Sequence, residues 1–481
     1  MRLRHITFSA FLLLISASLY CQSYQLTVVN GYGSGAYEAG DTVHIWAGEF
    51  PATQIFAGWT GQIAFLEDRG EWHTRIIMPA QAVTVTSNTR LMPPNSDLVL
   101  ENIMGRDTIK LVFSYFPPNP KAVVWFFHGT GGGAYGWVNP YDNRQLVNRC
   151  IADSLAVIIT ECEETTRGLI DMDNDGEIGQ WQYDPTTENV DFANLAAIRD
   201  TFELRGVIAD TIPNIGIGFS AGGALAVVLG WFQPEKWRVG IDYGTGGVSG
   251  AAQASISPAM ICPNRRDNHP NVGPESVNEA FVHQQMYLER GICSEVYVNE
   301  PSPLHPQRFQ RKPGISAAQS LALYSDLLNN NCLNSENYLT IPPHQIKNLV
   351  LANPQSWTSL ATLGIQQRAF VEDELAVLWT DHHFTGDFNA KAMRFINNAC
   401  GITSSTKPEP GKFSTLIRIV PNPADDMIRI EGIGAEDWIH IFSTTGQLVM
   451  TSKGDNISVA HLQSGLYIVR TALGTGKFVR I

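Results

Sequence analysis

The sequence has fewer positive than negative charges, no closely spaced cysteine pair and no long apolar run beyond the N-terminus. Each of these absences argues against a class of protein or site. Its 33 Lys and Arg against 46 Asp and Glu give a formal net charge of −13, which argues against nucleic acid or an anionic membrane as a partner. Beyond the N-terminus no segment is long enough for a transmembrane helix. No C-x-x-C pair occurs, so a structural zinc site has no support. The 481 residues, with ordinary apolar content, instead predict two to four globular domains.

The N-terminus predicts export. Arg2 and Arg4 precede a short apolar run within residues 1–22, which is the pattern of a secretory signal peptide cleaved near Cys21 or Gln22. An even number of cysteines then remains in an exported protein, which favours disulfides, although the sequence leaves their pairing open. These cysteines are Cys150, Cys162, Cys262, Cys293, Cys332 and Cys400. Cys262 ends an apolar run and fits a buried small hydrophobe equally well.

Composition and periodicity divide the mature chain into three parts and a linker. Residues 24–92 are rich in β-branched residues and turn signals, which predicts a small all-β module. Residues 98–402 alternate apolar runs with helical periodicity, the pattern of a parallel sheet built from strand–helix units. The expected strands are 121–127, 155–159, 214–218, 237–243, 258–262 and 294–298. Residues 403–412 form a linker, and 413–481 are again predicted to be all-β.

The stretch NIGIGFSAGGALAV contains a G-x-S-x-G pattern. Ser220 stands between Gly218 and Gly222, after an expected strand and before an expected helix. A serine on a strained strand-to-helix turn leaves no room for Cβ atoms two positions away and raises its hydroxyl above the sheet. The sequence therefore predicts that Ser220 is a nucleophile.

A serine nucleophile needs N–H donors for the developing oxyanion. The strand at 121–127 runs into the glycine-rich loop HGTGGG, residues 128–133. We expect the donors to be the N–H of Thr130 or Gly131, together with that of Ala221, the residue after the nucleophile. The loop lacks a P-loop lysine, which makes phosphate binding the weaker interpretation.

The acid and the base are expected after later strands of the same sheet. The order Ser, Asp, His is that of an α/β-hydrolase, in which the acid follows the second strand after the serine and the histidine follows the third. Asp267 and His305 occupy these places. The alternative base is His383, or its neighbour His382, after the strand-like run LAVLW. Asp242 is the less favoured acid.

With these motifs, the segment 98–330 resembles an α/β-hydrolase of the secreted esterase or polyester-depolymerase type, to which prolyl-oligopeptidase-like hydrolases are related. The resemblance implies that Ser220 is the nucleophile, that His305 is general base and then general acid, and that Asp267 holds the imidazole in its productive tautomer. The sequence LHPQRF around His305 departs from the glycine-flanked histidine that is usual in such enzymes.

Both ends of the mature chain resemble known modules. Residues 24–92 resemble the divergent internalin B-repeat modules of bacterial surface proteins, which implies a spacer or an adhesive module. The C-terminal part carries PNP (421–423), TGQ (445–447) and GLY (465–467). In these motifs it resembles the sorting domain of the type IX secretion system. That resemblance implies export through the type IX machinery, with the protein secreted or attached to the bacterial surface.

Two further patterns suggest a metal loop and a substrate wall. Asp171, Asp173 and Asp175 alternate as in the start of an EF-hand loop, which predicts a structural calcium site, although position twelve is a glutamine. The alternative is a solvated acidic loop. Tyr135 and Trp137 follow the oxyanion loop and either line a substrate site or seal the core.

The sequence thus favours an α/β-hydrolase domain flanked by two small all-β domains. The expected function is a secreted serine hydrolase that cleaves small or polymeric carboxylic esters through an acyl-enzyme and needs no cofactor for catalysis. The alternatives are a secreted prolyl-oligopeptidase-type peptidase and a non-catalytic surface adhesion protein.

Overall fold

The chain divides into two compact units, Met1–Ile402 and Thr403–Ile481. The computed structural model describes residues 22–398, 419–430, 434, 438–443, 448–471 and 474–481. The predicted signal peptide, apart from residue 22, and the predicted linker lie outside the described residues.

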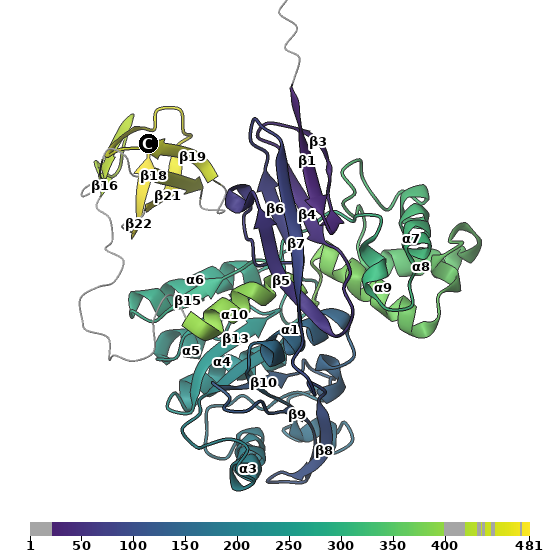
Figure 1. The fold of residues 1–481 in the computed structure, drawn as a ribbon. Coiled ribbons are helices and arrows are strands. Elements are labelled where there is room, and N and C mark those ends of the chain that lie inside the picture. Colours follow the sequence, from purple (N-terminus) through teal and green to yellow (C-terminus); the bar gives the residue numbers. More distant parts are fainter. Residues whose placement is uncertain (1–21, 399–418, 431–433, 435–437, 444–447, 472–473) are drawn as a thin grey trace, which may run out of the picture. The chain divides into compact units, whose positions relative to one another are not determined.

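Residues 24–92 form a module of short strands, as predicted (Figure 1). The strands are β1 Ser23–Val29, β2 Gly31–Tyr32, β3 Gly35–Glu38, β4 Thr42–Ala47, β5 Gln54–Gly61, β6 His73–Ile77 and β7 Val83–Leu91, with one 3₁₀ turn, η1 Ile63–Phe65. They form two sheets, β3-β1-β7-β5 and β2-β4-β6. Alternate apolar side chains such as Leu26, Ile45 and Ile76 are fully buried between them, which explains the period-two pattern of the sequence. The likeness to B-repeats stays a prediction.

The next segment builds an eight-stranded sheet in the order β8-β9-β11-β10-β12-β13-β14-β15. Its strands are β8 Val99–Met104, β9 Ile109–Tyr115, β10 Val123–Phe127, β11 Ala156–Ile159, β12 Asn214–Phe219, β13 Trp237–Tyr243, β14 Ala259–Cys262 and β15 Ser294–Val296. The strands from β10 to β15 pair in parallel, and β9 is antiparallel to both neighbours. All six expected strands are confirmed. The sequence missed β8 and β9; β8 lies at the sheet edge, where only one of its residues is buried.

Helices cover both faces of this sheet. They are α1 Tyr141–Ala152, α2 Glu163–Thr166, α3 Val190–Leu204, α4 Ala221–Phe232, α5 Ser249–Ala254, α6 Ser276–Glu289, α7 Ala317–Asn329, α8 Pro343–Ala352, α9 Ile365–Trp379 and α10 Asn389–Asn398, with 3₁₀ turns η2 Ala134–Trp137, η3 Arg308–Arg311, η4 Pro354–Ser356, η5 Leu360–Thr362 and η6 Gly386–Phe388. Apolar side chains of α1 and α10 pack on one face. Those of α3 and α4 pack on the other.

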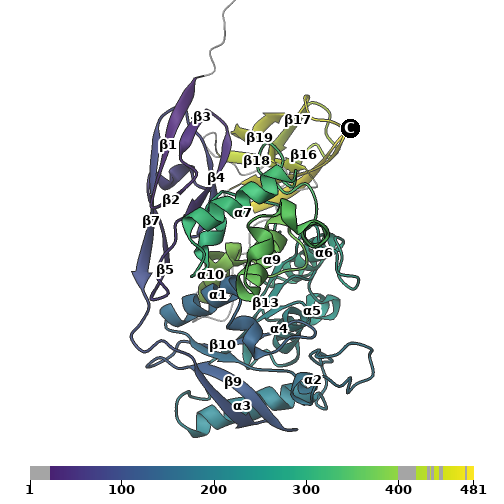
Figure 2. The same cartoon turned by 90° about the vertical axis from the view of Figure 1, so that its right-hand side faces the viewer.

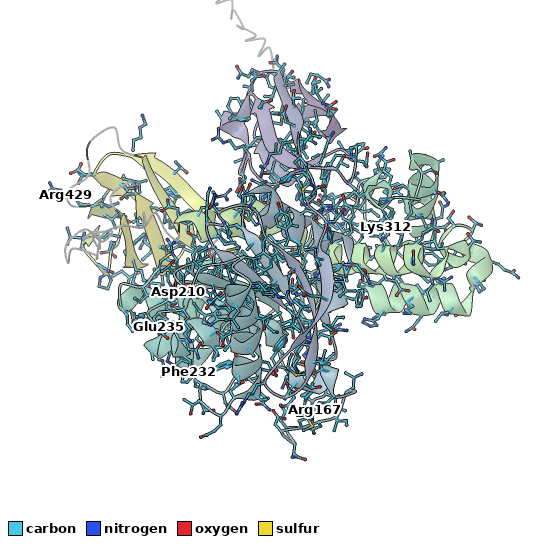
Figure 3. All side chains as sticks on the ribbon, turned by 60° about the horizontal axis from the view of Figure 1, so that its bottom comes forward. Arg167, Asp210, Phe232, Glu235, Lys312 and Arg429 are labelled. Carbon is cyan, nitrogen blue, oxygen red and sulfur yellow. The ribbon has the colours of Figure 1, made fainter. Side chains whose placement is uncertain are left out.

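The region that the sequence left open, from about residue 330 to 400, contains an inserted helical layer (Figure 2). Helices α7, α8 and α9 surround an apolar cluster of their own that includes Trp357 and Phe370. Lys312, labelled in Figure 3, lies just before this layer. The run LAVLW, which was expected to be a strand, lies inside α9. Its apolar residues face the helical cluster, and the prediction of a strand there is wrong.

The cysteines are mostly buried thiols. Cys150, Cys162, Cys262 and Cys332 are buried and free, so the prediction of disulfides is wrong for these four. Burial raises the pKa of the Cys162 thiol to about 12. These side chains therefore behave as small core hydrophobes. Cys400 lies outside the described residues.

The C-terminal unit is all-β, as predicted. Its described strands are β16 Ile419–Val420, β17 Met427–Ile430, β18 Trp438–Ser443, β19 Leu448–Lys453, β20 Asn456–Ser458, β21 Gly465–Thr471 and β22 Gly474–Arg480. They form two sheets, β16-β17-β20 and β19-β18-β21-β22, with a shared core that includes Ile428, Ile441 and Phe478. Within the described part of the chain, no helix has the length and apolar character needed to cross a membrane.

Candidate active site

Ser220 occupies a sharp turn between a strand and a helix. Strand β12 ends at Phe219 and helix α4 begins at Ala221, and Ser220 between them has φ 56° and ψ −124°, a conformation that is strained for a residue with a side chain. A Cβ on Gly218 would lie 1.9 Å from the carbonyl oxygen of Gly222. A Cβ on Gly222 would lie 2.4 Å from a backbone oxygen of β10. The two glycines of G-x-S-x-G are therefore required by backbone crowding, and the sheet with this elbow has the α/β-hydrolase fold.

His382 connects the elbow serine to Asp267. Its Nε2 lies 3.0 Å from Ser220 Oγ and its Nδ1 lies 2.7 Å from Asp267 Oδ2. Because a carboxylate only accepts, the proton belongs on Nδ1 and leaves Nε2 as the acceptor for the serine hydroxyl. The second oxygen of Asp267 accepts the backbone N–H of His269 at 2.9 Å. Ser220 and Asp267 are 7% and 2% exposed, so the pair of hydrogen bonds is protected from water.

Two neighbouring rings pack against the imidazole of His382. The imidazole packs against Phe219 with ring centroids 4.9 Å apart and against His269 at 4.5 Å. Phe219 precedes Ser220 and His269 lies two residues after Asp267, so residues next to the two partners of His382 also pack on its ring. The sequence singles out neither residue, because ring packing across loops leaves no spacing signal.

The predicted base His305 is not at the elbow. Its ring stacks on Tyr32 at 4.9 Å and packs against Trp46 at 4.6 Å, both in the N-terminal module. Burial, together with the cations Arg308 and Arg311, holds the pKa of His305 well below its usual value. His305 is 7% exposed and belongs to the packing between the module and the inserted helices. The prediction of a contact between His305 and the nucleophile is therefore wrong.

The alternative His383 is adjacent to the residue that makes the contact. Its Nε2 lies 3.5 Å from Asp373 Oδ1, on α9, and its carbonyl oxygen accepts the side-chain N–H of Asn264 at 3.2 Å. The neighbour His382, which the sequence left open beside it, is the histidine that reaches Ser220. The strand count was correct up to β15, but the chain then inserts α7 to α9 before it returns to the sheet edge.

The glycine-rich loop at residues 128–133 lies against Ser220. A Cβ on Gly129 would lie 3.2 Å from Ser220 Cβ. The N–H of Gly131 is already donated to Gly179 O at 3.1 Å, so the expectation that it binds an oxyanion does not fit this geometry. The N–H groups of Thr130 and Ala221 stay the predicted donors. The Thr130 hydroxyl is donated to Gln180 Oε1 at 2.9 Å.

His128, a neutral imidazole, connects this loop to Cys162 by hydrogen bonds. Its Nδ1 lies 2.8 Å from Gly129 O and its Nε2 accepts the N–H of Cys162 at 3.2 Å, so the single proton is on Nδ1. Trp181 Nε1 donates to His128 O at 2.9 Å. Burial lowers the pKa of His128 to about 4. The ring must therefore gain a proton on unfolding at mildly acidic pH.

This proton uptake predicts a pH-dependent contribution to stability. His128 is neutral in the folded protein above pH 4 and is protonated in the unfolded chain below about pH 6.5. Its contribution is therefore complete at neutral pH and is lost as the pH falls from about 6.5 towards 4. We expect the free energy of unfolding of wild type, relative to His128→Gln, to fall by about 2 kcal/mol between pH 7 and pH 5. Urea denaturation of both proteins at the two pH values measures this, and an unchanged difference would contradict it.

Asp242 is a buried carboxyl group beneath the elbow helix. It is 0% exposed, its Oδ2 accepts the hydroxyl of Thr245, and its Oδ1 has no hydrogen-bond partner among the described residues. Burial raises its pKa to about 7. Because Asp267 is the carboxylate bonded to His382, Asp242 has no direct role in orienting the base.

The acidic loop begins after α2 and Arg167, which is labelled in Figure 3. It brings together a set of carboxylates that differs from the predicted set. Oxygens of Glu164, Asp171 and Asp173 lie within 4.8 Å of one another. Asp175 instead accepts the N–H of Glu177 at 2.8 Å and the side-chain N–H of Gln180 at 2.7 Å. Oxygen ligands of this kind suit calcium, and calcium binding by this loop stays a prediction.

The aromatic residues after the oxyanion loop separate into one core residue and one surface residue. Trp137 is 1% exposed and packs against Phe126 and Phe384. It seals the core, and the prediction that it lines a substrate site is wrong. Tyr135 is 48% exposed and packs edge-on against Phe113. Its role in binding substrate stays a prediction.

Comparisons with known proteins found one family match and a set of similar solved structures. Residues 418–480 match the family described as secretion system C-terminal sorting domain. No curated protein matches the sequence. Among solved structures, the chain is similar to a dienelactone hydrolase from Anabaena variabilis, with 13% identity, coverage of 50% of this chain and 98% of that chain, and a TM-score of 0.32. It is also similar to an esterase from Pyrococcus furiosus, with 14% identity, coverage of 42% and 81%, and a TM-score of 0.30. A fluorophosphonate-binding serine hydrolase from Staphylococcus aureus has 10% identity, coverage of 42% and 89%, and a TM-score of 0.30.

The C-terminal match carries a conclusion about location. The matched residues include the whole described part of the second unit except its last residue. A type IX sorting domain directs a protein to secretion or to attachment at the cell surface. The chain is therefore a secreted or surface-attached protein with a C-terminal type IX sorting domain.

Proposed function

We propose that this protein is a serine hydrolase that cleaves carboxylic esters through an acyl-enzyme on Ser220. The observation that carries the proposal is the unbroken chain of contacts from Ser220 Oγ to His382 Nε2 and from His382 Nδ1 to Asp267. A neutral hydroxyl is a poor nucleophile, and an oriented imidazole removes its proton as it attacks. The strained elbow holds Oγ in place before substrate binds.

Acylation proceeds with every proton assigned. Ser220 Oγ forms a bond to the ester carbonyl carbon while its proton passes to His382 Nε2, and the carbonyl electron pair moves onto oxygen. The N–H groups of Thr130 and Ala221 stabilise that oxyanion. The intermediate then collapses, the bond between carbon and the leaving oxygen breaks, and His382 gives its proton to the departing alkoxide.

Deacylation repeats these steps with water in place of the alcohol. His382 Nε2 takes a proton from a water molecule, whose oxygen attacks the acyl carbon. The tetrahedral intermediate collapses, the acid is released, and the proton returns to Ser220 Oγ. Asp267 stays ionised throughout and stabilises the imidazolium that forms twice in each cycle.

Turnover assays separate this function from its two alternatives. A fluorophosphonate probe and p-nitrophenyl butyrate test for an active serine, and an aminoacyl p-nitroanilide tests for a peptidase. We expect labelling and ester turnover by wild type, with little anilide turnover, and neither activity in Ser220→Ala. Anilide turnover that exceeds ester turnover would favour a peptidase, and a folded wild type that neither labels nor turns over would favour an adhesion protein.

A further inference from the structure

The β module (residues 24–92) packs on the stretch of chain that carries His382. This stretch, residues 380–391 (the histidine segment), runs from the end of α9 to the first turn of α10, and between these two helices it contains only the 3₁₀ turn η6. Its beginning is anchored to the acid loop, because Thr380 accepts the backbone N–H of Arg266 with both its carbonyl oxygen and its Oγ1, each at 3.2 Å. His382 lies two residues after this anchor, and the rest of the segment is held at its other end.

Glu71 of the β module anchors that other end. Its two carboxylate oxygens accept the backbone N–H of Ala390 at 3.0 Å and of Lys391 at 2.8 Å. These N–H groups belong to the first turn of α10, where the helix has no internal acceptor and where a negative charge is stabilised by the helix dipole. Glu71 is 1% exposed. A residue some 320 positions away therefore caps the helix that follows the base.

A second contact joins the β module to the same segment through a chain of hydrogen-bonded side chains. His73 Nδ1 lies 2.7 Å from Asp387 Oδ2, and His73 Nε2 lies 2.9 Å from His44 Nδ1. His44 Nε2 lies 3.3 Å from the hydroxyl of Tyr338. One direction of donation satisfies all four groups: Tyr338 to His44, His44 to His73, and His73 to Asp387. The pairing of His73 with Asp387 is thus specific and partly buried.

Residues of the hydrolase domain also contact the histidine segment. Asp142 on α1 accepts the N–H of Gly386 at 3.3 Å and pairs with Arg311 at 2.8 Å. The Arg311 guanidinium lies over the ring of Trp72, 3.7 Å from its centroid. Trp72 stands between Glu71 and His73 in the sequence, so one short run of the β module meets the segment and its supports together.

We infer that the β module is part of the catalytic unit, in which Glu71 and His73 are positioning residues that hold His382 within reach of Ser220. This inference rests on the proposed serine-hydrolase function. The resemblance of the module to surface repeats implied a spacer or an adhesive part, and a spacer needs no buried polar contact with the catalytic domain. Loosening either anchor lets the histidine segment shift, and a displacement near 1 Å at a catalytic group lowers turnover by about 100-fold.

The test uses the full chain with Glu71→Gln and His73→Phe. Glutamine keeps the size of Glu71 but presents an NH₂ group to one of the two helix N–H groups, and phenylalanine keeps the ring of His73 without its hydrogen bonds. We expect kcat for p-nitrophenyl butyrate to fall by roughly 10- to 100-fold with KM nearly unchanged. The rate of fluorophosphonate labelling should fall in parallel, because phosphonylation of Ser220 needs the same base.

Tyr32→Phe is the matched control. Tyr32 also lies in the β module and bonds across the boundary, to Gln310, but it contacts the inserted helices rather than the histidine segment. We expect this variant to keep wild-type kcat. A double-mutant cycle of His73→Phe with Asp387→Asn adds a direct check, because the double variant should lose no more than the larger single loss if both act through one contact.

The outcomes distinguish this inference from the function on which it rests. If wild type neither labels nor hydrolyses esters, the proposed function fails. If wild type is active and folded Glu71→Gln and His73→Phe keep its kcat, even with a lower Tm, the module only stabilises the fold and the inference is overturned. If either variant does not fold, Asp387→Asn, which exchanges a single heavy atom, takes its place and must show the same kcat loss.

Discussion

Replacing His382 by alanine is expected to lower kcat for p-nitrophenyl butyrate by about 10⁴- to 10⁶-fold, while Ser220→Ala causes a loss of the same size. The two residues act as one unit, because the serine hydroxyl has no other base within hydrogen-bonding distance among the described residues. The double variant should therefore lose no more activity than either single variant. Steady-state kinetics at high enzyme concentration, where residual turnover can be detected, measure the losses of the single and double variants.

His305→Ala is the control that this prediction requires. His305 is buried against Tyr32 and Trp46, so its removal leaves a cavity and should lower the Tm. Its turnover below the melting transition should stay within about tenfold of wild type. A loss of turnover in His305→Ala that matches Ser220→Ala, with activity retained in His382→Ala, would contradict the assignment of the base.

Asp267→Asn is expected to lower kcat by about 10⁴-fold with little change in KM. The amide can donate its NH₂ group to His382 Nδ1, which must then carry no proton. The imidazole proton is then on Nε2, which can no longer accept the proton of the serine hydroxyl. The geometry can be preserved while the tautomer becomes wrong. Kinetics of the variant between pH 6 and pH 9, together with its Tm, separate this loss from unfolding.

Asp242→Asn is the matched comparison for the acid. Asp242 is as deeply buried as Asp267 and lies near the end of β13, but its hydrogen bond goes to Thr245 and not to His382. Its amide variant should therefore keep most of the wild-type kcat. Equal losses in the two variants would show that the carboxylate at 267 has no special role.

The sequence predicted those parts of the site whose signal is local. The elbow was recognisable because Gly218 and Gly222 are required by backbone crowding, and Asp267 was found because it lies in the loop that follows β14. The base was missed for a topological reason. The chain leaves β15, builds α7 to α9 around a separate apolar cluster, and only then returns to the elbow with His382. No local pattern marks an insertion of this length.

The role of the β module was hidden from the sequence for a related reason. Alternating apolar residues predicted its strands and its core, because the period of two is set by each strand alone. The contacts of Glu71 and His73 with the histidine segment join residues more than 300 positions apart. A glutamate or histidine in the sequence of a β module carries no mark of its partner, and only the folded chain brings the two together.

The most direct test of the central claim is to incubate the folded wild-type protein with a fluorophosphonate and locate the adduct by mass spectrometry of its peptides. We expect a single adduct on Ser220, formed quickly by wild type and by His305→Ala, and formed far more slowly by His382→Ala. An adduct on another residue, or labelling that is as fast in His382→Ala as in wild type, would contradict it.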